Sequence, residues 1–335
     1  MAMQNQPIVT VLMPVFNAAS FIRESIESIL HQTLPNFELL IINDGSTDCS
    51  LNIIHSFNDQ RIRLVSLEQN HGIVSALNLG LELARSDYLA RMDADDIACP
   101  ERFQQQLHYL EQNPDCVVLG TRTVVVDPEN QILYSPQVST GHEEILKELL
   151  QWRGSRLCHP TVMMPTEAVK AVGGYTQEYM NDDIDLFLKL TKSGKFANLP
   201  EPLLRHRVHL SSVCHTRDES EVDRIKKRIY FDAIANLSLS QEFLEANQIT
   251  PPTSSLASDY YSAYEVYRRW CLLARRSGFY RSSLKYCYKT FVNQPFQAKT
   301  YWTLFHCLMG EHYGSALWKF LMNIRQTLSA KVEQT

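Results

Sequence analysis

The strongest chemical signal in the sequence is an acidic cluster in RMDADDIACP, residues 91–100. Three aspartates lie within four positions, directly after an apolar run that reads as a buried strand. Aspartates two positions apart on a loop can direct their carboxylates to one side, and such hard oxygen ligands suit Mg²⁺ or Mn²⁺. The alternative is an Asp-rich turn in which Asp96 caps the helix that begins near Pro100. The cluster therefore predicts either a divalent-cation site or a polar turn.

Two other segments place polar or permissive residues after apolar runs. MPVFN (13–17) ends the first apolar run, and IINDGSTD (41–48) ends the second. A carboxylate in the second segment can accept a hydrogen bond from a ring N–H, and Gly45 lets the backbone come close to a ligand. Without a ligand, the first segment would be a turn after a strand-ending proline, and the second an Asx-turn with a helix cap.

A second acidic cluster, YMNDDIDLFLKL (179–190), begins a segment with an apolar helical face. Asp182 and Asp183 near a helix N-terminus interact favourably with the helix dipole, which would explain them without any catalytic role. Histidines come from CHPTVMMP (158–165) and EPLLRHRVHLSSVCH (201–215). A lone histidine is usually a structural or surface residue, so these segments carry no function by themselves.

The elements that must position these residues alternate clearly in the first hundred residues. Short apolar runs rich in β-branched residues predict strands, and amphipathic segments between them predict helices. Three successive strand–helix–strand units predict a parallel sheet with right-handed crossovers. The three polar segments then lie at carboxyl ends of strands, where open α/β sheets bind ligands, and form one crevice. The expected strands are 8–14, 37–43, 62–67 and 87–92, and the expected helices 20–32, 46–57 and 72–86.

Taken in order, these segments resemble the family 2 glycosyltransferases, which are inverting, nucleotide-sugar-dependent enzymes of GT-A fold. The resemblance runs over roughly residues 8–212, and its motifs are specific jointly although each is weak alone. It implies an α/β fold with a Rossmann-like, mostly parallel sheet flanked by helices and a C-terminal helical region. The donor-site residues that it implies are Pro14, Phe16, Asn17, Asp44, Asn70, Gly72, Asn78, Asp93 and Arg207.

The resemblance also implies roles around the diphosphate. Asp44 would read the base, and Asp93 and Asp95 would form the DxD pair that holds Mn²⁺ or Mg²⁺, with Asp95 the direct ligand. Arg207 and His209 lie where the family places a loop that closes over the diphosphate, so His209 is an expected third metal ligand. Two positions depart from the family pattern. Asn43 stands where many relatives carry an aspartate, and Leu77 stands where many carry an arginine.

The second acidic cluster matches the family element that contains the catalytic base. By that match Asp183 would deprotonate the acceptor hydroxyl, and Asp185 would be structural. A base is chemically required, because a sugar hydroxyl is a poor nucleophile until its proton is removed. His159 and the GGY turn (173–175) would border the acceptor.

Charge and aromatic content divide the chain into two regions. The net charge is −5, but residues 268–335 contain eleven Lys or Arg and two Asp or Glu, and residues 260–320 hold 17 of the 33 aromatic residues. We therefore expect a catalytic domain at 1–215 and a basic, aromatic-rich helical region at 216–335. Such a region can bind an anionic membrane surface or another subunit, or simply cap the fold. Nucleic-acid binding is not expected, since no recognition motif is present.

The expected location is the cytoplasm, with peripheral attachment to the inner face of the membrane. The first residues, MAMQNQP, lack the basic and apolar regions of a secretory signal, and no window of about 18 uninterrupted apolar residues predicts a spanning helix. None of the eight cysteines forms a CxxC pair, so they are expected to be small core residues in a reducing compartment.

The sequence thus predicts a metal-dependent, inverting hexosyltransferase of family 2. We expect it to transfer sugar from a UDP-linked donor to a hydroxyl of a saccharide or lipid-linked acceptor, in bacterial surface polysaccharide or lipopolysaccharide synthesis. One alternative is a nucleotidyltransferase, which would carry a Gly-rich phosphate loop with a basic residue after the first strand; MPVFNAAS (13–20) lacks one. The other is an inactive nucleotide-sugar-binding protein, but both the DxD pair and Asp183 are present.

Overall fold

The computed structural model describes residues 6–151, 157–176, 182–211, 219–237, 244–245, 247–250 and 262–310. The chain folds into two compact units, which are described separately. The first unit consists of Met1–Val124, Pro136–Arg207 and Asp218–Ser258, and the second of Val125–Ser135, Val208–Arg217 and Asp259–Thr335.

The N-terminal half of the first unit is a parallel sheet. Its strands lie in the order β3-β2-β1-β4, so the chain first extends the sheet to one side of β1 and then returns to the other side. This reversal between β1 and β4 is a topological switch point, and open α/β sheets bind ligands outside the carboxyl ends of the strands there. The elements are β1 (Val9–Val15), α1 (Ile22–Leu30), β2 (Phe37–Asp44), α2 (Ser50–His55), β3 (Ile62–Leu67), α3 (Ile73–Leu83) and β4 (Tyr88–Arg91).

Beyond β4 the sheet becomes antiparallel. β8 pairs with β4 and β6, and β5 pairs with β9, giving the order β4-β8-β6-β9-β5. The expected α/β sheet flanked by helices is confirmed, but the sheet is mixed and not mostly parallel, because only the half that precedes the acidic cluster is parallel. The additional strands are β5 (Ile97–Ala98), β6 (Cys116–Val126), β8 (Met163–Pro165) and β9 (Lys195–Arg207).

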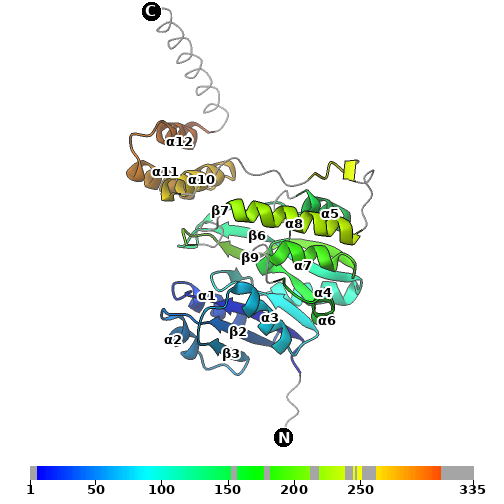
Figure 1. Ribbon diagram of the computed structural model, residues 1–335. Helices are drawn as coiled ribbons and strands as arrows, with labels where there is room; N and C mark the ends of the chain where they lie inside the picture. Colours follow the sequence, from blue (N-terminus) through cyan, green and yellow to red (C-terminus); the bar gives the residue numbers. More distant parts are fainter. Residues whose placement is uncertain are drawn as a thin grey trace, which may run out of the picture. The chain divides into compact units, whose positions relative to one another are not determined.

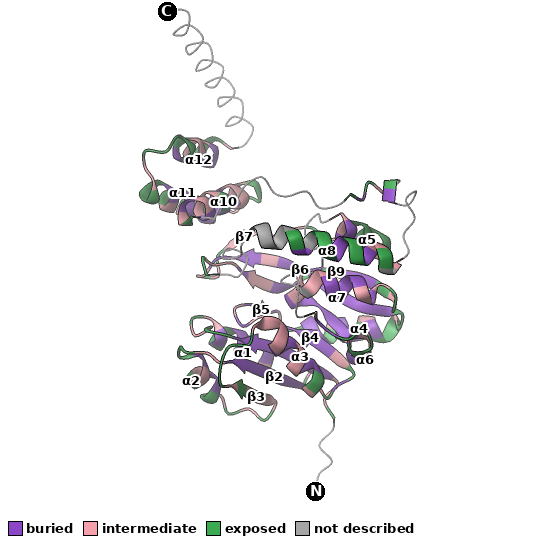
Figure 2. Cartoon of the chain, in the orientation of Figure 1, coloured by how far each residue is buried: buried purple, intermediate pink, exposed green. Residues whose placement is uncertain are grey.

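Helices cover both faces of this sheet, and Figure 2 shows its strands largely buried. Along β1 the side chains alternate: Leu12 packs into one core with α3, α5, α6, α7 and α8, whereas Val11 and Met13 pack into the other with α1, α2 and α4 (Figure 1). Successive side chains of a strand point to opposite faces, and both faces of β1 are buried. The strand is therefore apolar on both faces. The remaining helices are α4 (Arg102–Gln112), α5 (His142–Leu150), α6 (Thr166–Ala171), α7 (Asp182–Leu190), α8 (Glu219–Leu237) and the 3₁₀ turn η1 (His159–Thr161).

The second unit packs three helices on a strand hairpin. β7 (Ile132–Tyr134) pairs with the last residues of β6, and α10 (Ala263–Arg276), α11 (Tyr280–Asn293) and α12 (Ala298–Met309) pack together. Asp127 of the hairpin is buried, and its carboxylate accepts a 2.8 Å hydrogen bond from the hydroxyl of Tyr286 and pairs with Lys285. The hairpin is therefore fixed to α11 by a buried polar contact.

Compact packing does not follow the expected boundary between residues 215 and 216. Ile225, Ile229 and Tyr230 of α8 are buried in the core of the first unit, so this helix belongs to that unit. The hairpin at Val125–Ser135 belongs instead to the unit of α10–α12. The functional division into 1–215 and 216–335 stays a prediction. Among the described residues, no helix combines the length and apolarity that crossing a membrane would need.

Candidate active site

The acidic cluster lies at the end of β4, next to β1 at the switch point of the sheet. Each carboxylate of Asp93, Asp95 and Asp96 has an oxygen within 4.8 Å of the others. Asp93 and Asp95 are partly exposed, whereas Asp96 is completely buried. The three neighbouring aspartates therefore do not have equivalent environments.

Asp93 is oriented by an arginine on the strand that precedes it. The guanidinium of Arg91 donates a 2.7 Å hydrogen bond to Asp93 Oδ1, and only 2% of the Arg91 side chain is exposed. The buried guanidinium therefore fixes the orientation of the Asp93 carboxylate. No role was expected for Arg91. Its position at the end of an apolar strand, two residues before Asp93, could have indicated a buried partner for that carboxylate.

The buried carboxylate of Asp96 makes hydrogen bonds with β9. Its Oδ1 accepts a 2.8 Å hydrogen bond from the backbone N–H of Arg207, and His206 Nδ1 lies 3.1 Å from the same oxygen. Burial raises the pKa of Asp96 to about 6, against the opposing effect of His206. Burial alone would lower the pKa of His206, but the charge of Asp96 and its hydrogen bond raise it to about 9.

The expectation that Asp96 caps the next helix is wrong. α4 begins after Glu101, and no side chain makes a capping hydrogen bond there. The short strand β5 lies between the cluster and the helix, and Asp96 uses its oxygens on β9 instead. A buried carboxylate requires strong partners, and a backbone N–H with an imidazolium supplies them. The sequence did not indicate a role for His206. Its contact with Asp96 helps to hold the acidic cluster in place.

Arg207 supports the loop that carries the cluster. Its Nε donates a 2.8 Å hydrogen bond to the backbone carbonyl of Asp95, and its guanidinium pairs with Glu24 and stacks over the ring of Phe21. Only 1% of the side chain is exposed. These contacts fix the position of the Asp95 backbone. A direct contact between Arg207 and a diphosphate stays a prediction.

At the neighbouring strand end, Asn17 connects two loops. Its backbone has a positive φ of 51°, and its Oδ1 accepts hydrogen bonds from the N–H groups of Thr47 and Asp48 at 2.8 and 3.3 Å. Phe16 beside it is 48% exposed, so its ring is available to a planar ligand. Pro14 lies within β1 and precedes these two residues. The contacts of Asn17 therefore join the loop after β1 to the loop after β2.

Asp44 fixes the loop that precedes α3. Its two carboxylate oxygens accept hydrogen bonds of 2.8 Å each, one from the N–H of His71 and one from that of Gly72. Asn70 Oδ1 accepts a second hydrogen bond from the N–H of Gly72 at 2.9 Å. Asp44 is 3% exposed, so its visible role is to position this loop. Base recognition by Asp44 stays a prediction.

Gly45 is required by close packing against that same loop. Its φ is +68°, and a Cβ atom there would lie 2.4 Å from the carbonyl carbon of Gln69. Asn78 is likewise committed to protein, because its amide donates to and accepts from the backbone of Tyr175 at 2.8 and 2.9 Å. The structure places Asn78 as a support of the 173–175 turn, and its part in donor binding stays a prediction.

Asp183 lies in the first turn of α7, and its Oδ1 accepts a 2.9 Å hydrogen bond from the N–H of Ile184. Asp185 is buried and binds Thr176 at 2.6 Å and Lys189 at 2.8 Å, which agrees with a structural role. The part of the acidic segment at 179–181 lies outside the described residues. Asp183 is partly exposed, whereas Asp185 is buried.

Cys158 immediately precedes η1. Burial raises its pKa well above the ordinary value, and the charges of Asp96, Asp93 and Asp183 raise it further. The neighbouring His159 has its pKa lowered to about 3 by burial and by the charge of Arg91, and its Nε2 lies 3.0 Å from the Tyr175 hydroxyl.

His209 belongs to the second unit. Its Nδ1 lies 2.9 Å from the hydroxyl of Ser211. Its expected role as a metal ligand stays a prediction, as does the loop closure inferred for this segment. His215 lies outside the described residues.

The donor atoms at the end of β4 fit an oxygen-preferring divalent cation. Asp93 and Asp95 present carboxylate oxygens at the partly exposed surface, and hard oxygen ligands are those that Mg²⁺ and Mn²⁺ prefer. Asp96 does not fit as a direct ligand, because it is buried and bound to β9. The pair that fits is the DxD pair.

Comparison with known proteins agrees with this architecture. The sequence profile of the family described as Glycosyl transferase family 2 matches residues 10–173. An uncharacterized glycosyltransferase of Haemophilus influenzae is 33% identical over 242 residues, covering 67% of this chain and 74% of that protein. A chondroitin synthase of Escherichia coli is 26% identical over 257 residues, covering 74% of this chain but only 35% of the synthase.

A similar fold occurs in a solved structure. The crystal structure of residues 1–349 of Staphylococcus aureus TarS, in complex with UDP-GlcNAc, has a TM-score of 0.59 at 16% identity. The match covers 90% of this chain and 79% of the TarS chain. At this level of identity the likeness concerns the fold.

Proposed function

Because the chain belongs to glycosyl transferase family 2, we propose that it is an inverting, metal-dependent hexosyltransferase that uses a UDP-linked sugar. Its acceptor would be a hydroxyl of a saccharide or of a lipid-linked saccharide in bacterial surface polysaccharide or lipopolysaccharide synthesis. Similarity to a chondroitin synthase and the fold shared with a UDP-GlcNAc-binding protein support this choice of donor and product class.

The donor would lie across the carboxyl ends of β1, β2 and β4. The exposed ring of Phe16 can stack against a nucleobase, while Asp93 and Asp95 lie where a diphosphate would reach the end of β4. A divalent cation held by Asp93 and Asp95 would offset the negative charge that builds on the departing diphosphate. Arg91 and Arg207 would keep that pair in place, because one orients Asp93 and the other holds the Asp95 backbone.

Asp183 would act on the acceptor. Its carboxylate removes the proton from the acceptor hydroxyl as that oxygen attacks the anomeric carbon, and the bond between this carbon and the diphosphate oxygen breaks. Attack opposite the leaving group inverts the anomeric configuration. The partial exposure of Asp183 and its position in the first turn of α7 support this role.

One observation carries the proposal: the carboxylates of Asp93 and Asp95 are partly exposed at the end of β4, with oxygen atoms within 4.8 Å of each other, where open α/β sheets bind ligands. The test is calorimetry with UDP and UDP-sugars, with and without Mn²⁺, followed by a transfer assay on candidate acceptors. We expect UDP-sugar binding that depends on Mn²⁺. Binding without any transfer would favour an inactive binding protein, and binding of nucleoside triphosphates in preference to UDP-sugars would favour a nucleotidyltransferase.

We also propose that the C-terminal helices attach the enzyme to an anionic membrane surface. On α11, four apolar side chains at helical spacing are between 41% and 70% exposed; these are Leu284, Tyr288, Phe291 and Val292. Residues 268–335 also carry eleven basic and two acidic side chains. An exposed apolar stripe with surrounding positive charge is typical of helices that lie in the membrane interface. Peripheral attachment would place the enzyme near lipid-linked acceptors.

A further inference from the structure

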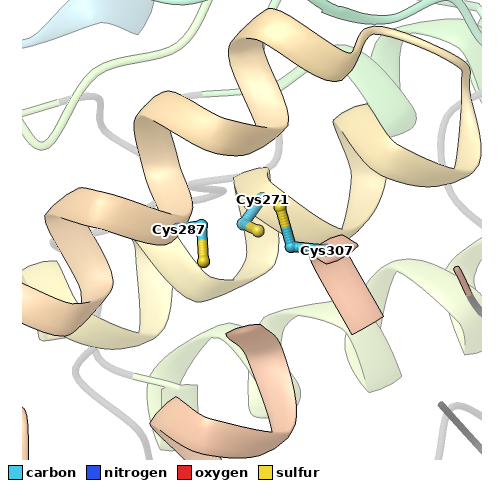
Figure 3. A group of neighbouring side chains, drawn as sticks. All are labelled: Cys271, Cys287 and Cys307. Atoms are coloured by element: carbon cyan, nitrogen blue, oxygen red, sulfur yellow. The ribbon is translucent and has the colours of Figure 1, made fainter. Parts of the chain in front are cut away.

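Three cysteines, one from each helix of the second unit, meet in its core (Figure 3). Cys271 lies on α10, Cys287 on α11 and Cys307 on α12, and their sulfur atoms all lie within 4.8 Å of one another. All three are buried and are free thiols. Their positions in the sequence, 16 and 20 residues apart, match no short metal-binding motif. Only the packing of the three helices brings them together.

The surroundings of the sulfurs are those of a closed site. The hydroxyl of Ser283 lies 3.2 Å from Cys307 Sγ and 3.6 Å from Cys271 Sγ, so an oxygen is available beside the cluster. Arg275 Nε donates a 2.9 Å hydrogen bond to the backbone carbonyl of Cys307, which places a positive charge near the third cysteine. Around them Trp270, Tyr286 and other buried residues exclude water.

Thiolates are the ligands that thiophilic closed-shell cations prefer. In a tetrahedral zinc site with Zn–S bonds of about 2.3 Å, the sulfurs lie about 3.8 Å apart, so the cluster would need to contract by about 1 Å at most. On binding, each thiol loses its proton to solvent and its sulfur forms a bond to the cation. Three thiolates with Zn²⁺ leave one negative charge in the core, whereas Cu⁺ would leave two. Because buried charge is costly, the site favours the divalent ion.

We propose that Cys271, Cys287 and Cys307 form a structural Zn²⁺ site that joins α10, α11 and α12, with the Ser283 hydroxyl as a candidate fourth ligand. The second unit has a small apolar core, and three of the nine described residues that make it up are these cysteines. Small cores gain most from a cross-link or a metal, and metal binding adds directly to folding stability. The alternative is that the thiols serve only as small apolar side chains.

The test uses the full-length protein after EDTA dialysis under reducing conditions. Titration with Co²⁺ should produce a thiolate-to-cobalt charge-transfer band that saturates at one equivalent and disappears when Zn²⁺ is added. Zn²⁺ should also raise the melting temperature. Cys271→Ser, Cys287→Ser and Cys307→Ser should each weaken Zn²⁺ binding at least 100-fold in competition with a chromophoric chelator and abolish the melting-temperature shift.

Cys116→Ser is the matched control, because Cys116 is buried in the core of the first unit, whereas the cluster belongs to the second. This variant should lose stability from the same chemical change but keep the cobalt band and the zinc-dependent shift. The absence of the band in the wild-type protein would overturn the proposal, whether or not the variants fold. A band that persists in the cluster variants, or binding of Cu⁺ without binding of Zn²⁺, would also overturn it.

Discussion

The carboxylate of Asp96 accepts a 2.8 Å hydrogen bond from the backbone N–H of Arg207, 111 residues later in the chain. This contact joins the loop that carries the acidic cluster to the end of β9. The Arg207 side chain also donates a hydrogen bond to the backbone carbonyl of Asp95. The exposed pair is thus held by a buried frame, and the two kinds of aspartate should respond differently to substitution.

Asp95→Ala should abolish Mn²⁺-dependent binding of UDP with little loss of stability, because Asp95 offers a carboxylate at the partly exposed surface. Asp96→Ala should instead lower the free energy of unfolding by about 2–4 kcal/mol, since it leaves the Arg207 N–H and His206 without their buried acceptor. Calorimetric UDP binding and urea unfolding measure the two effects. Equal loss of metal binding in both variants, with unchanged stability, would contradict this division.

Stability should fall as pH rises through about 9, owing to His206. The pKa of this residue is raised in the folded protein, so its contribution is fully present below its unfolded pKa of about 6.5 and is lost above about 9. Because a third of the ring is exposed, solvent screening limits the effect to on the order of 1–2 kcal/mol. Urea unfolding of the metal-free protein between pH 6 and pH 10 checks this. His206→Asn should flatten the profile, and an unchanged slope would assign the pH dependence to other groups.

Asp183→Asn should fold normally and bind UDP and Mn²⁺ with near-normal affinity but transfer sugar roughly 10²- to 10⁴-fold more slowly, because the amide accepts no proton. Single-turnover transfer alongside calorimetric binding separates the two steps. Asp185→Asn is the comparison variant; it should lose stability because Asp185 binds Thr176 and Lys189. Turnover of Asp183→Asn within a few-fold of wild type would place the base elsewhere. A matching loss of nucleotide affinity would place Asp183 in the donor site.

Gly45→Ala should reduce both stability and donor binding. The new Cβ would lie 2.4 Å from the Gln69 backbone, and the positive φ of Gly45 adds strain of about 1–2 kcal/mol. Gly278→Ala is a matched control, because Gly278, between α10 and α11, also has a positive φ but a Cβ there would have no atom within 4 Å. We expect the larger loss of melting temperature, and the larger loss of UDP affinity, in Gly45→Ala. Equal effects in both variants would show that strain alone matters.

Removing the apolar stripe of α11 should weaken membrane binding. Flotation with anionic vesicles should recover the wild-type protein at low salt and less of it at high salt, because each basic residue near the surface contributes on the order of 1 kcal/mol that salt screens. Leu284→Ser combined with Tyr288→Ser should reduce recovery at low salt. Phe231→Ser, an exposed aromatic of α8, should not. If wild-type protein fails to float at low salt, α10–α12 serve as a helical cap.

Several features of the fold and site could be predicted from the sequence because they depend on local periodicity. Apolar runs and amphipathic segments predicted the parallel half of the sheet, which the structure confirms as β3-β2-β1-β4. Polar residues that follow apolar runs indicated where β1, β2 and β4 end, which the structure confirms. The order of the motifs predicted the family, which the comparisons confirm. The periodicity of a strand or helix is a local property, so no distant contact is needed to recognise it.

What each polar side chain binds was decided only by tertiary structure. The partner of Asp96 is 111 residues away and that of Asn78 is 97 residues away, and no local pattern specifies either distance. Both oxygens of Asp44 hold the loop before α3, a contact that the sequence did not indicate. The helix-cap assignment of Asp96 was wrong for the same reason: a buried carboxylate takes the strongest donors that the folded chain brings to it, and these came from β9.

The C-terminal region shows the same distinction. Its basic and aromatic composition was evident from the sequence, and so was its helical pattern. The sequence could not show that the hairpin at Val125–Ser135 joins α10–α12 in one unit, or that three cysteines from three helices meet within 4.8 Å. Composition and periodicity determine which residues a helix buries. Which buried residues then touch is set by how helices pack, and this depends on the shapes of all the side chains in the core at once.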